Sequence, residues 1–155
     1  MSNAETYLID AIQLAMENVR ERKNWPFGAV LVKDGKVLAR SVNEVDTTCD
    51  PSAHAEMQAV RAAAKALGST DLTGSEVYAS GYPCSMCLTA MYLAGVSKVY
   101  YAYSNEDGAP HGLSTAAIAA ELARPPAEQA LKAAYVRTRA PGRPDLYAAW
   151  DQRQA

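Results

Sequence analysis

Two short motifs hold the side chains most able to do chemistry. The first is His54-Ala55-Glu56 and the second is Pro83-Cys84-Ser85-Met86-Cys87, in which Cys84 follows His54 by thirty residues. Together they supply one imidazole and two thiolates, a donor set that suits zinc in a catalytic site with a fourth position left for water. A lone histidine at a helix start often only caps or packs, and an isolated C-x-x-C can be a redox pair. The combination predicts a zinc site with His54, Cys84 and Cys87 as ligands.

Glu56 lies two residues after the predicted histidine ligand. Side chains two apart on a helix point in different directions, so His54 and Glu56 can converge only on a target beyond the helix N-terminus. Two thiolates formally neutralise the charge of Zn²⁺, which weakens its ability to acidify a bound water. A carboxylate beside the metal can take that proton and deliver it elsewhere. We therefore expect Glu56 to be a catalytic proton carrier rather than a ligand; the alternative is an ordinary carboxylate in the first helical turn.

Two other interpretations of the cysteine pair stay open. A thioredoxin-like dithiol would not need His54 or Glu56, and its activity would survive metal removal. A structural zinc domain without turnover needs four protein ligands, whereas the sequence offers three and a surplus acid. We expect Cys49 not to be a ligand, and His111 to be structural or exposed.

The elements that must position these residues alternate between helix and strand. Apolar spacing predicts helices over 5–23, 52–67, 85–94, 114–123 and 145–152, and β-rich runs predict strands over 27–32, 36–42, 76–80, 96–102 and 133–138. Asp34-Gly35 predicts a tight hairpin between the first two strands. This order predicts an α/β fold, a three-layer α/β/α sandwich with a mixed five-stranded sheet. Both motifs then lie at helix N-termini, whose positive ends favour thiolate ligands.

Composition limits the kinds of partner. The 155 residues, 49% of them hydrophobic, are enough for a single domain over 1–155 with its own core. Fifteen basic against seventeen acidic residues give a net charge of −2, which disfavours nucleic acid as a partner. No apolar run reaches the roughly 18–20 residues of a membrane span, and three cysteines do not make a disulfide framework. We expect a cytoplasmic protein without a membrane partner.

Several segments resemble the cytidine deaminase-like superfamily, in the branch that holds bacterial guanine deaminases and tRNA adenosine deaminases. They are Pro26-Phe27-Gly28-Ala29-Val30, Asn43, Asp50-Pro51-Ser52-Ala53-His54-Ala55-Glu56 and Pro83-Cys84-Ser85-Met86-Cys87-Leu88. In the carboxy-terminal third, residues 101–107, 125–129 and 146–150 resemble guanine deaminases. The basic terminal helix typical of the tRNA enzymes is missing from this sequence.

The resemblance implies one Zn²⁺ per chain, with a bound water or hydroxide, and a small nucleobase as substrate. It favours hydrolysis of guanine to xanthine and ammonia, with Glu56 moving protons. The expected substrate contacts are Asn43, Phe27, Asp107, Trp25 and Ala55. The resemblance also implies a homodimer. Alternative substrates are guanosine, another amino-heterocycle of the cytosine type, and the adenosine of a tRNA.

Two departures from the family pattern bear on the substrate. Tyr82 stands where the family usually has a glutamate before Pro-Cys, and a phenol cannot balance a positive charge as a carboxylate does. Guanine deaminases often extend further than Ala155, with a tail whose terminal tyrosine closes over the substrate. We expect both departures to leave the metal chemistry intact and to affect which heterocycle is accepted.

Overall fold

A single mixed sheet organises the chain, of which the computed structural model describes residues 2–153. Its strands are β1 (Gly28–Lys33), β2 (Lys36–Val42), β3 (Ser75–Gly81) and β4 (Lys98–Tyr103), in the order β2-β1-β3-β4. Strand β1 is antiparallel to both β2 and β3, whereas β3 and β4 are parallel. The predicted α/β class with a mixed sheet is confirmed. The predicted count of five strands is wrong, because this sheet has four.

The β1–β2 connection is a tight hairpin, as predicted. Asp34 and Gly35 have φ angles of 51° and 73°, and positive φ at both central residues is the condition for a type I′ turn. The turn brings Lys33 opposite Lys36 and so sets the register of the two strands. Glycine makes this conformation accessible because it has no Cβ to clash with the backbone.

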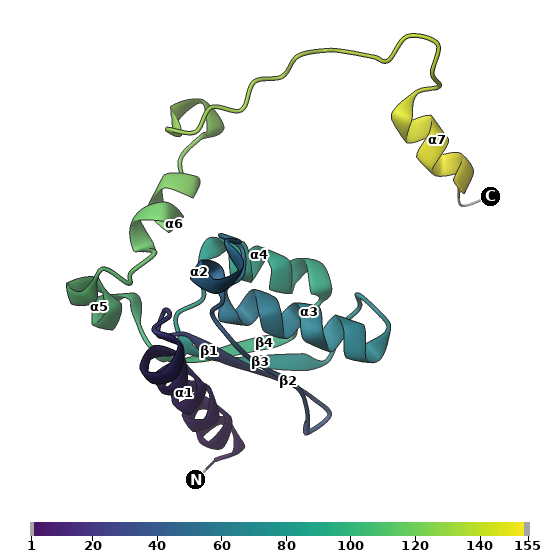
Figure 1. Ribbon diagram of the computed structural model, residues 1–155. Helices are drawn as coiled ribbons and strands as arrows, with labels where there is room; N and C mark the ends of the chain where they lie inside the picture. The colour runs from purple at the N-terminus through teal and green to yellow at the C-terminus, as the bar shows by residue number, and fades with distance from the viewer. Residues whose placement is uncertain (1, 154–155) are drawn as a thin grey trace. The chain divides into compact units, whose positions relative to one another are not determined.

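Helices cover both faces of the sheet. They are α1 (Asn3–Arg22) on one face, and α3 (Ala55–Leu67) with α4 (Ser85–Ala94) on the other (Figure 1). Ala29 and Leu31 of β1 belong to the core beneath α3 and α4, whereas Val30 and Val32 belong to the core beneath α1. A strand buried on both faces has a continuous apolar run, which explains the sequence of β1.

The missing fifth strand corresponds to residues 133–138. They form no ladder with another described strand, and the side chains of Tyr135 and Val136 are 83% and 76% exposed. A strand exists only where a neighbouring edge takes up its backbone hydrogen bonds, so β-favouring residues alone do not create one.

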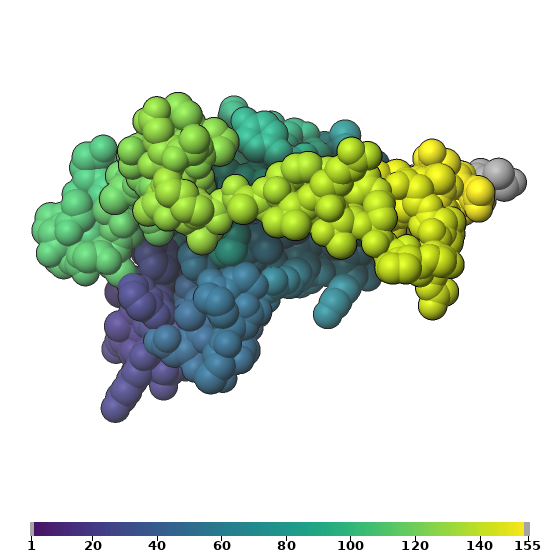
Figure 2. Space-filling view, turned by 90° about the horizontal axis from the view of Figure 1, so that it is seen from above, coloured from purple at the N-terminus to yellow at the C-terminus, as the bar shows by residue number. Residues whose placement is uncertain are grey.

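The remaining elements are short. They are α2 (Val45–Thr48), α5 (Asn105–Gly108), the 3-10 helix η1 (Ala109–His111), α6 (Ala116–Leu122), the 3-10 helix η2 (Pro126–Glu128) and α7 (Leu146–Arg153). The chain divides into two units, one up to Glu121 and one from Leu122 onward. Within the second unit, drawn from yellow-green to yellow in Figure 2, residues 132–140 run without helix or strand. Within residues 2–153, no helix is both long and apolar enough to cross a membrane.

Candidate metal centre and catalytic pocket

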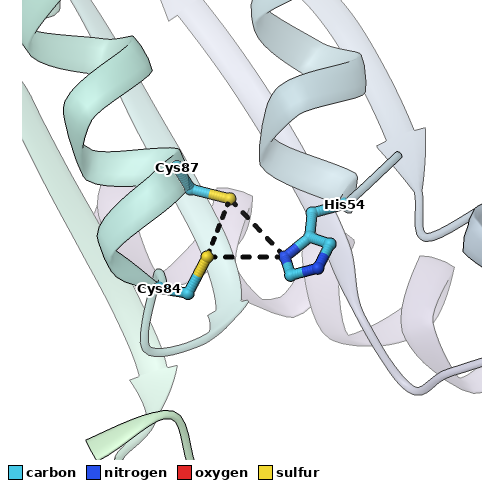
Figure 3. Close-up of side chains that lie close together, drawn as sticks. All are labelled: His54, Cys84 and Cys87. Atoms are coloured by element: carbon cyan, nitrogen blue, oxygen red, sulfur yellow. Dashed lines mark hydrogen bonds between the residues drawn. The ribbon is translucent and has the colours of Figure 1, made fainter. Parts of the chain in front are cut away.

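His54 and Cys84 occupy equivalent places at the starts of two helices. His54 is the N-cap of α3 and Cys84 is the N-cap of α4, and neither side chain caps its own helix. The predicted helix over 52–67 would place His54 within its first turn, whereas α3 begins three residues later than predicted, at Ala55. Cys87 lies in the first turn of α4, three residues after Cys84 and therefore on the same face. Three side chains from two helix starts thus point at one spot (Figure 3).

The spacing of the three donor atoms fits a zinc ion. The two Sγ atoms are 3.6 Å apart, and His54 Nδ1 lies 3.6 Å from Cys84 Sγ and 3.7 Å from Cys87 Sγ. Tetrahedral zinc, with bonds of about 2.3 Å to sulfur and about 2.0 Å to nitrogen, would set the sulfurs about 3.8 Å apart and each about 3.5 Å from the nitrogen. Both cysteines are free thiols. The donor set and its geometry therefore fit zinc.

The three ligand side chains also influence one another's protonation. The Cys87 thiol donates a hydrogen bond to Cys84, which lowers the pKa of Cys84 to about 4. The same hydrogen bond, together with the burial of the sulfur, raises the pKa of Cys87. The contact with Cys84 raises the pKa of His54. The lowered pKa of Cys84 favours its thiolate, which is the form that binds a metal.

Glu56 is buried beside this cluster. Its side chain is 5% exposed, and its Oε2 atom lies 3.7 Å from Cys87 Sγ. Burial raises the pKa of Glu56 to about 7. Within residues 2–153 the metal-ligating group consists of His54, Cys84 and Cys87, without a fourth protein ligand. A site with three protein ligands has a place for water, which a closed structural zinc site lacks.

A family comparison supports this geometry. The sequence profile of the cytidine and deoxycytidylate deaminase zinc-binding region matches residues 1–103. The chain belongs to this family. Because its site holds the buried acid as well as the three ligands, the site is that of a zinc-dependent deaminase.

Within this family, the chain is similar to individual deaminases of known type. The chain is 43% identical over 129 residues to the guanine deaminase of Bacillus subtilis strain 168, an alignment that covers 83% of each chain. It is 38% identical over 112 residues to the tRNA-specific adenosine deaminase of the same strain, covering 72% of this chain and 69% of the relative. Among solved structures, guanine deaminase from Bacillus subtilis matches with a TM-score of 0.86 and 38% identity, over 98% of this chain and 95% of the other.

His54 and Cys84 of the metal-ligating group line a pocket of about 190 Å³. Its lining residues are Trp25, Phe27, Asn43, Val45, His54, Glu56, Tyr82, Cys84, Gly112, Leu113, Ser114 and Thr115. Three of the predicted substrate contacts, Trp25, Phe27 and Asn43, are thus brought together with the metal centre. The indole nitrogen of Trp25 donates to Asp46 Oδ2 over 3.0 Å, which holds the ring at the pocket wall.

Asn43 presents a hydrogen-bond donor to this pocket. Its side chain is almost fully buried, and its Oδ1 accepts from the backbone N–H of Val45 over 3.1 Å. That bond fixes the orientation of the carboxamide, because Oδ1 takes the backbone donor and leaves Nδ2 on the other side. Among the described residues Nδ2 has no protein acceptor. It can therefore donate to an acceptor atom of a bound heterocycle.

The other two predicted contacts lie elsewhere. Asp107 lines a neighbouring cavity rather than the catalytic pocket, and its Oδ2 accepts from the backbone N and Oγ of Ser104 over 2.8 and 3.0 Å. These bonds lower the pKa of Asp107. Ala55 is fully buried in the core between the sheet and α3 and is not in the pocket lining. Substrate contact by Asp107 or Ala55 stays a prediction.

The segment before His54 is held by α3 itself. Asp50 Oδ1 accepts from the backbone N and Oγ of Ser52 over 2.8 and 2.6 Å, a local turn that brings the chain to the helix start. Arg61, two turns into α3, donates from Nη2 to Ser52 Oγ over 2.9 Å. The helix that carries His54 and Glu56 thereby fixes the segment that leads into it.

Sequence reasoning missed several residues of the site, because Val45, Gly112, Leu113, Ser114 and Thr115 also line the pocket and Asn18 supports its wall. Ser114 and Thr115 line the pocket and are held by Asn105, whose Oδ1 accepts from Ser114 Oγ and Thr115 N. Asn18 of α1 is buried and donates from Nδ2 to the backbone carbonyl oxygens of Trp25 and Asn43. A signal for Asn18 exists in the sequence, because it lies on the buried stripe of α1, three residues after Ala15.

Proposed function

We propose that this protein hydrolyses guanine to xanthine and ammonia. The observation that carries the proposal is the buried Glu56 carboxyl beside the zinc ligands. Glu56 lines a pocket of about 190 Å³, which has room for a single nucleobase. Support for guanine comes from the guanine deaminase of Bacillus subtilis, which the chain resembles over most of both lengths. The solved structure of NE0047 in complex with 2,6-diaminopurine, 25% identical, adds a relative that binds a purine.

His54, Cys84 and Cys87 would hold one zinc ion per chain, with a fourth position left to water. Zinc bound there supplies Lewis acidity, which makes a water molecule nucleophilic at neutral pH. Asn43 Nδ2 donates to an acceptor atom of the base and so orients it in the pocket. The rings of Phe27 and Trp25 supply an apolar wall that limits access of bulk water.

Glu56 moves the protons of the reaction. Its carboxylate accepts a proton from the attacking water and delivers it to N3, the unprotonated ring nitrogen next to C2. The C2–N bond then breaks as Glu56 carries the second proton of the water, from the new C2 hydroxyl, to the departing amine. One water is consumed and one ammonia leaves, so the product carries a carbonyl at C2. The burial of Glu56 shields these transfers from bulk solvent.

A free base fits the chain better than a tRNA does. With a net charge of −2, the sequence lacks the basic excess that phosphate backbones attract. We further propose that residues 1–155 work as a single deaminase domain in the cytoplasm. The coverage of 98% of the chain by the guanine deaminase structure supports the first point, and three free thiols suit a reducing compartment.

We also propose a homodimer. Large apolar side chains are strongly exposed in the single chain, among them Tyr92, Leu93, Leu131, Tyr135 and Tyr147. Exposed apolar surface of this extent is typical of a contact with another protein. Sedimentation at micromolar concentration tests the proposal: a mass of two chains supports it, and a strictly monomeric mass would overturn it.

The function is tested by ammonia release from zinc-loaded protein, with guanine, guanosine, cytosine, cytidine and adenosine in parallel. Guanine should be turned over fastest, and Glu56→Ala should retain zinc but lose about 10²–10⁴-fold in rate. Glu21→Ala, at an exposed position of α1, is the matched control. Ammonia release from another of these amines, with none from guanine, would show that the proposed substrate is wrong. Zinc binding without any turnover would instead favour a structural zinc domain.

A further inference from the structure

A larger cavity lies beside the catalytic pocket. Its volume is about 460 Å³, against about 190 Å³ for the pocket at the zinc ligands. The two hollows have three lining residues in common: Phe27, Tyr82 and Leu113. These three side chains form a partition between the place where a base would bind and a space more than large enough for a second ring.

Each side chain of the partition is held by its surroundings. The Phe27 ring lies so close to Gly81 that a Cβ there would be 2.9 Å from Phe27 Cε1. Leu113 packs on Gly108, where a Cβ would be 3.4 Å from the Leu113 Cβ, and its backbone N–H donates to the Gly108 carbonyl over 3.0 Å. Gly81 thus makes room for the Phe27 ring, and Leu113 is held against Gly108 by its backbone.

Tyr82 is held by an aromatic contact instead. Its ring meets that of Tyr101 edge-on, with 5.0 Å between the ring centroids, and its backbone N–H donates to the Tyr103 carbonyl over 2.8 Å. Its side chain is 39% exposed, whereas Phe27 and Leu113 are half-buried. Tyr82 is therefore the part of the partition that can be shortened with the least disturbance of the core.

The space beyond the partition is suited to an apolar group. Ile12 and Met16 of α1 line it, together with Pro26. The Asp107 carboxylate, also in its lining, already accepts two hydrogen bonds from Ser104. An aromatic or alkyl substituent would gain favourable burial there, because apolar surface would leave water.

We propose that Tyr82 sets the upper size limit of the substrate, by closing the catalytic pocket off from the larger apolar cavity. This proposal rests on the deaminase function proposed above. Shortening Tyr82 joins the two hollows and admits amino-heterocycles that carry an apolar substituent. Specificity for a small base then depends on a wall that excludes larger molecules, in addition to contacts that attract the base.

The test compares Tyr82→Ala with the unchanged protein on guanine, 7-benzylguanine and 9-benzylguanine. We expect the ratio of kcat/KM for one benzylguanine isomer to that for guanine to rise about tenfold or more. Adding Met16→Trp to Tyr82→Ala should refill the larger cavity and return the ratio toward its original value. Glu21→Ala, at an exposed position of α1 and in neither cavity, is the control and should leave the ratio unchanged.

Binding measured without turnover separates this proposal from the proposed function. Calorimetry in a Glu56→Ala background should show tighter benzylguanine binding once Tyr82 is shortened. If the unchanged protein releases no ammonia from guanine, the proposed function is wrong. The comparison of benzylguanine binding still tests whether Tyr82 separates the two cavities. Should Tyr82→Ala not fold, Leu113→Ala opens the same wall. Benzylguanine binding and turnover that stay unchanged in the folded variant, or a Met16→Trp addition without effect, would overturn the proposal.

Discussion

Asn18 Nδ2 lies 2.9 Å from the backbone carbonyl oxygen of Asn43, and the same nitrogen lies 2.9 Å from that of Trp25. A single buried carboxamide on α1 therefore fixes two segments that line the catalytic pocket. Because Asn43 and Trp25 lie in the pocket wall, helix α1 shapes the site without touching the substrate. Asn18 is a positioning residue.

Replacing Asn18 with leucine should weaken substrate binding and stability together. Asn18→Leu leaves two carbonyl oxygens without their donor, which costs about 1–3 kcal/mol in the free energy of unfolding. Within residues 2–153, Asn18 Oδ1 has no partner to lose. KM for guanine should rise while zinc content stays the same, as measured by urea unfolding, steady-state kinetics and metal analysis. Gln13→Leu, on the exposed side of α1, is the control; an unchanged KM would contradict the positioning role.

Asn43→Asp should raise KM without releasing zinc. The substitution keeps the oxygen that accepts from Val45 N and replaces the donor Nδ2 with a second acceptor. Loss of one hydrogen bond to the base, with an added negative charge, should raise KM about tenfold. Steady-state kinetics on zinc-loaded protein measures the effect. If kcat alone changed, Asn43 would be acting on the chemistry rather than on binding.

The two classes of cysteine should respond differently to substitution. Cys87→Ser removes a buried ligand sulfur and should abolish stoichiometric zinc binding, with ammonia release falling alongside. Cys49→Ser changes an exposed thiol outside the ligand group and should keep both. Metal analysis after dialysis against a chelator measures the zinc content of the two variants. Equal zinc loss in the two variants would show that the assigned ligand set is wrong.

At Gly28 the backbone of α1 lies close against β1. A Cβ at this position would lie 2.3 Å from the Ala11 carbonyl oxygen and 2.9 Å from Ala15 N, both backbone atoms. Because the helix cannot yield as a flexible side chain would, Gly28→Ala should destabilise the fold by about 1–3 kcal/mol. Chemical denaturation measures this, with Lys36→Ala in the exposed hairpin as the control. An undiminished free energy of unfolding would mean that α1 shifts easily.

The sequence by itself determined the parts of the site that depend on short spacings. A C-x-x-C places two sulfurs on one face of a helical turn, and a His-x-Glu at a helix start directs both side chains past its N-terminus. Such relations follow from backbone geometry over a few residues, so the order of the amino acids is enough to predict them. The same holds for the Asp34-Gly35 hairpin, whose turn conformation depends on two neighbouring residues.

Only the tertiary structure decided what depends on contacts between distant segments. Residues 133–138 have strand-like composition but no described strand pairs with them, and the carboxylate of Asp107 is engaged by Ser104 beside another cavity. Asn18 lies four residues before the end of α1, and its two acceptors could not be predicted from its neighbours in the chain. The reason is physical: which strand edges pair, and which side chains surround a cavity, depend on the packing of all the layers at once.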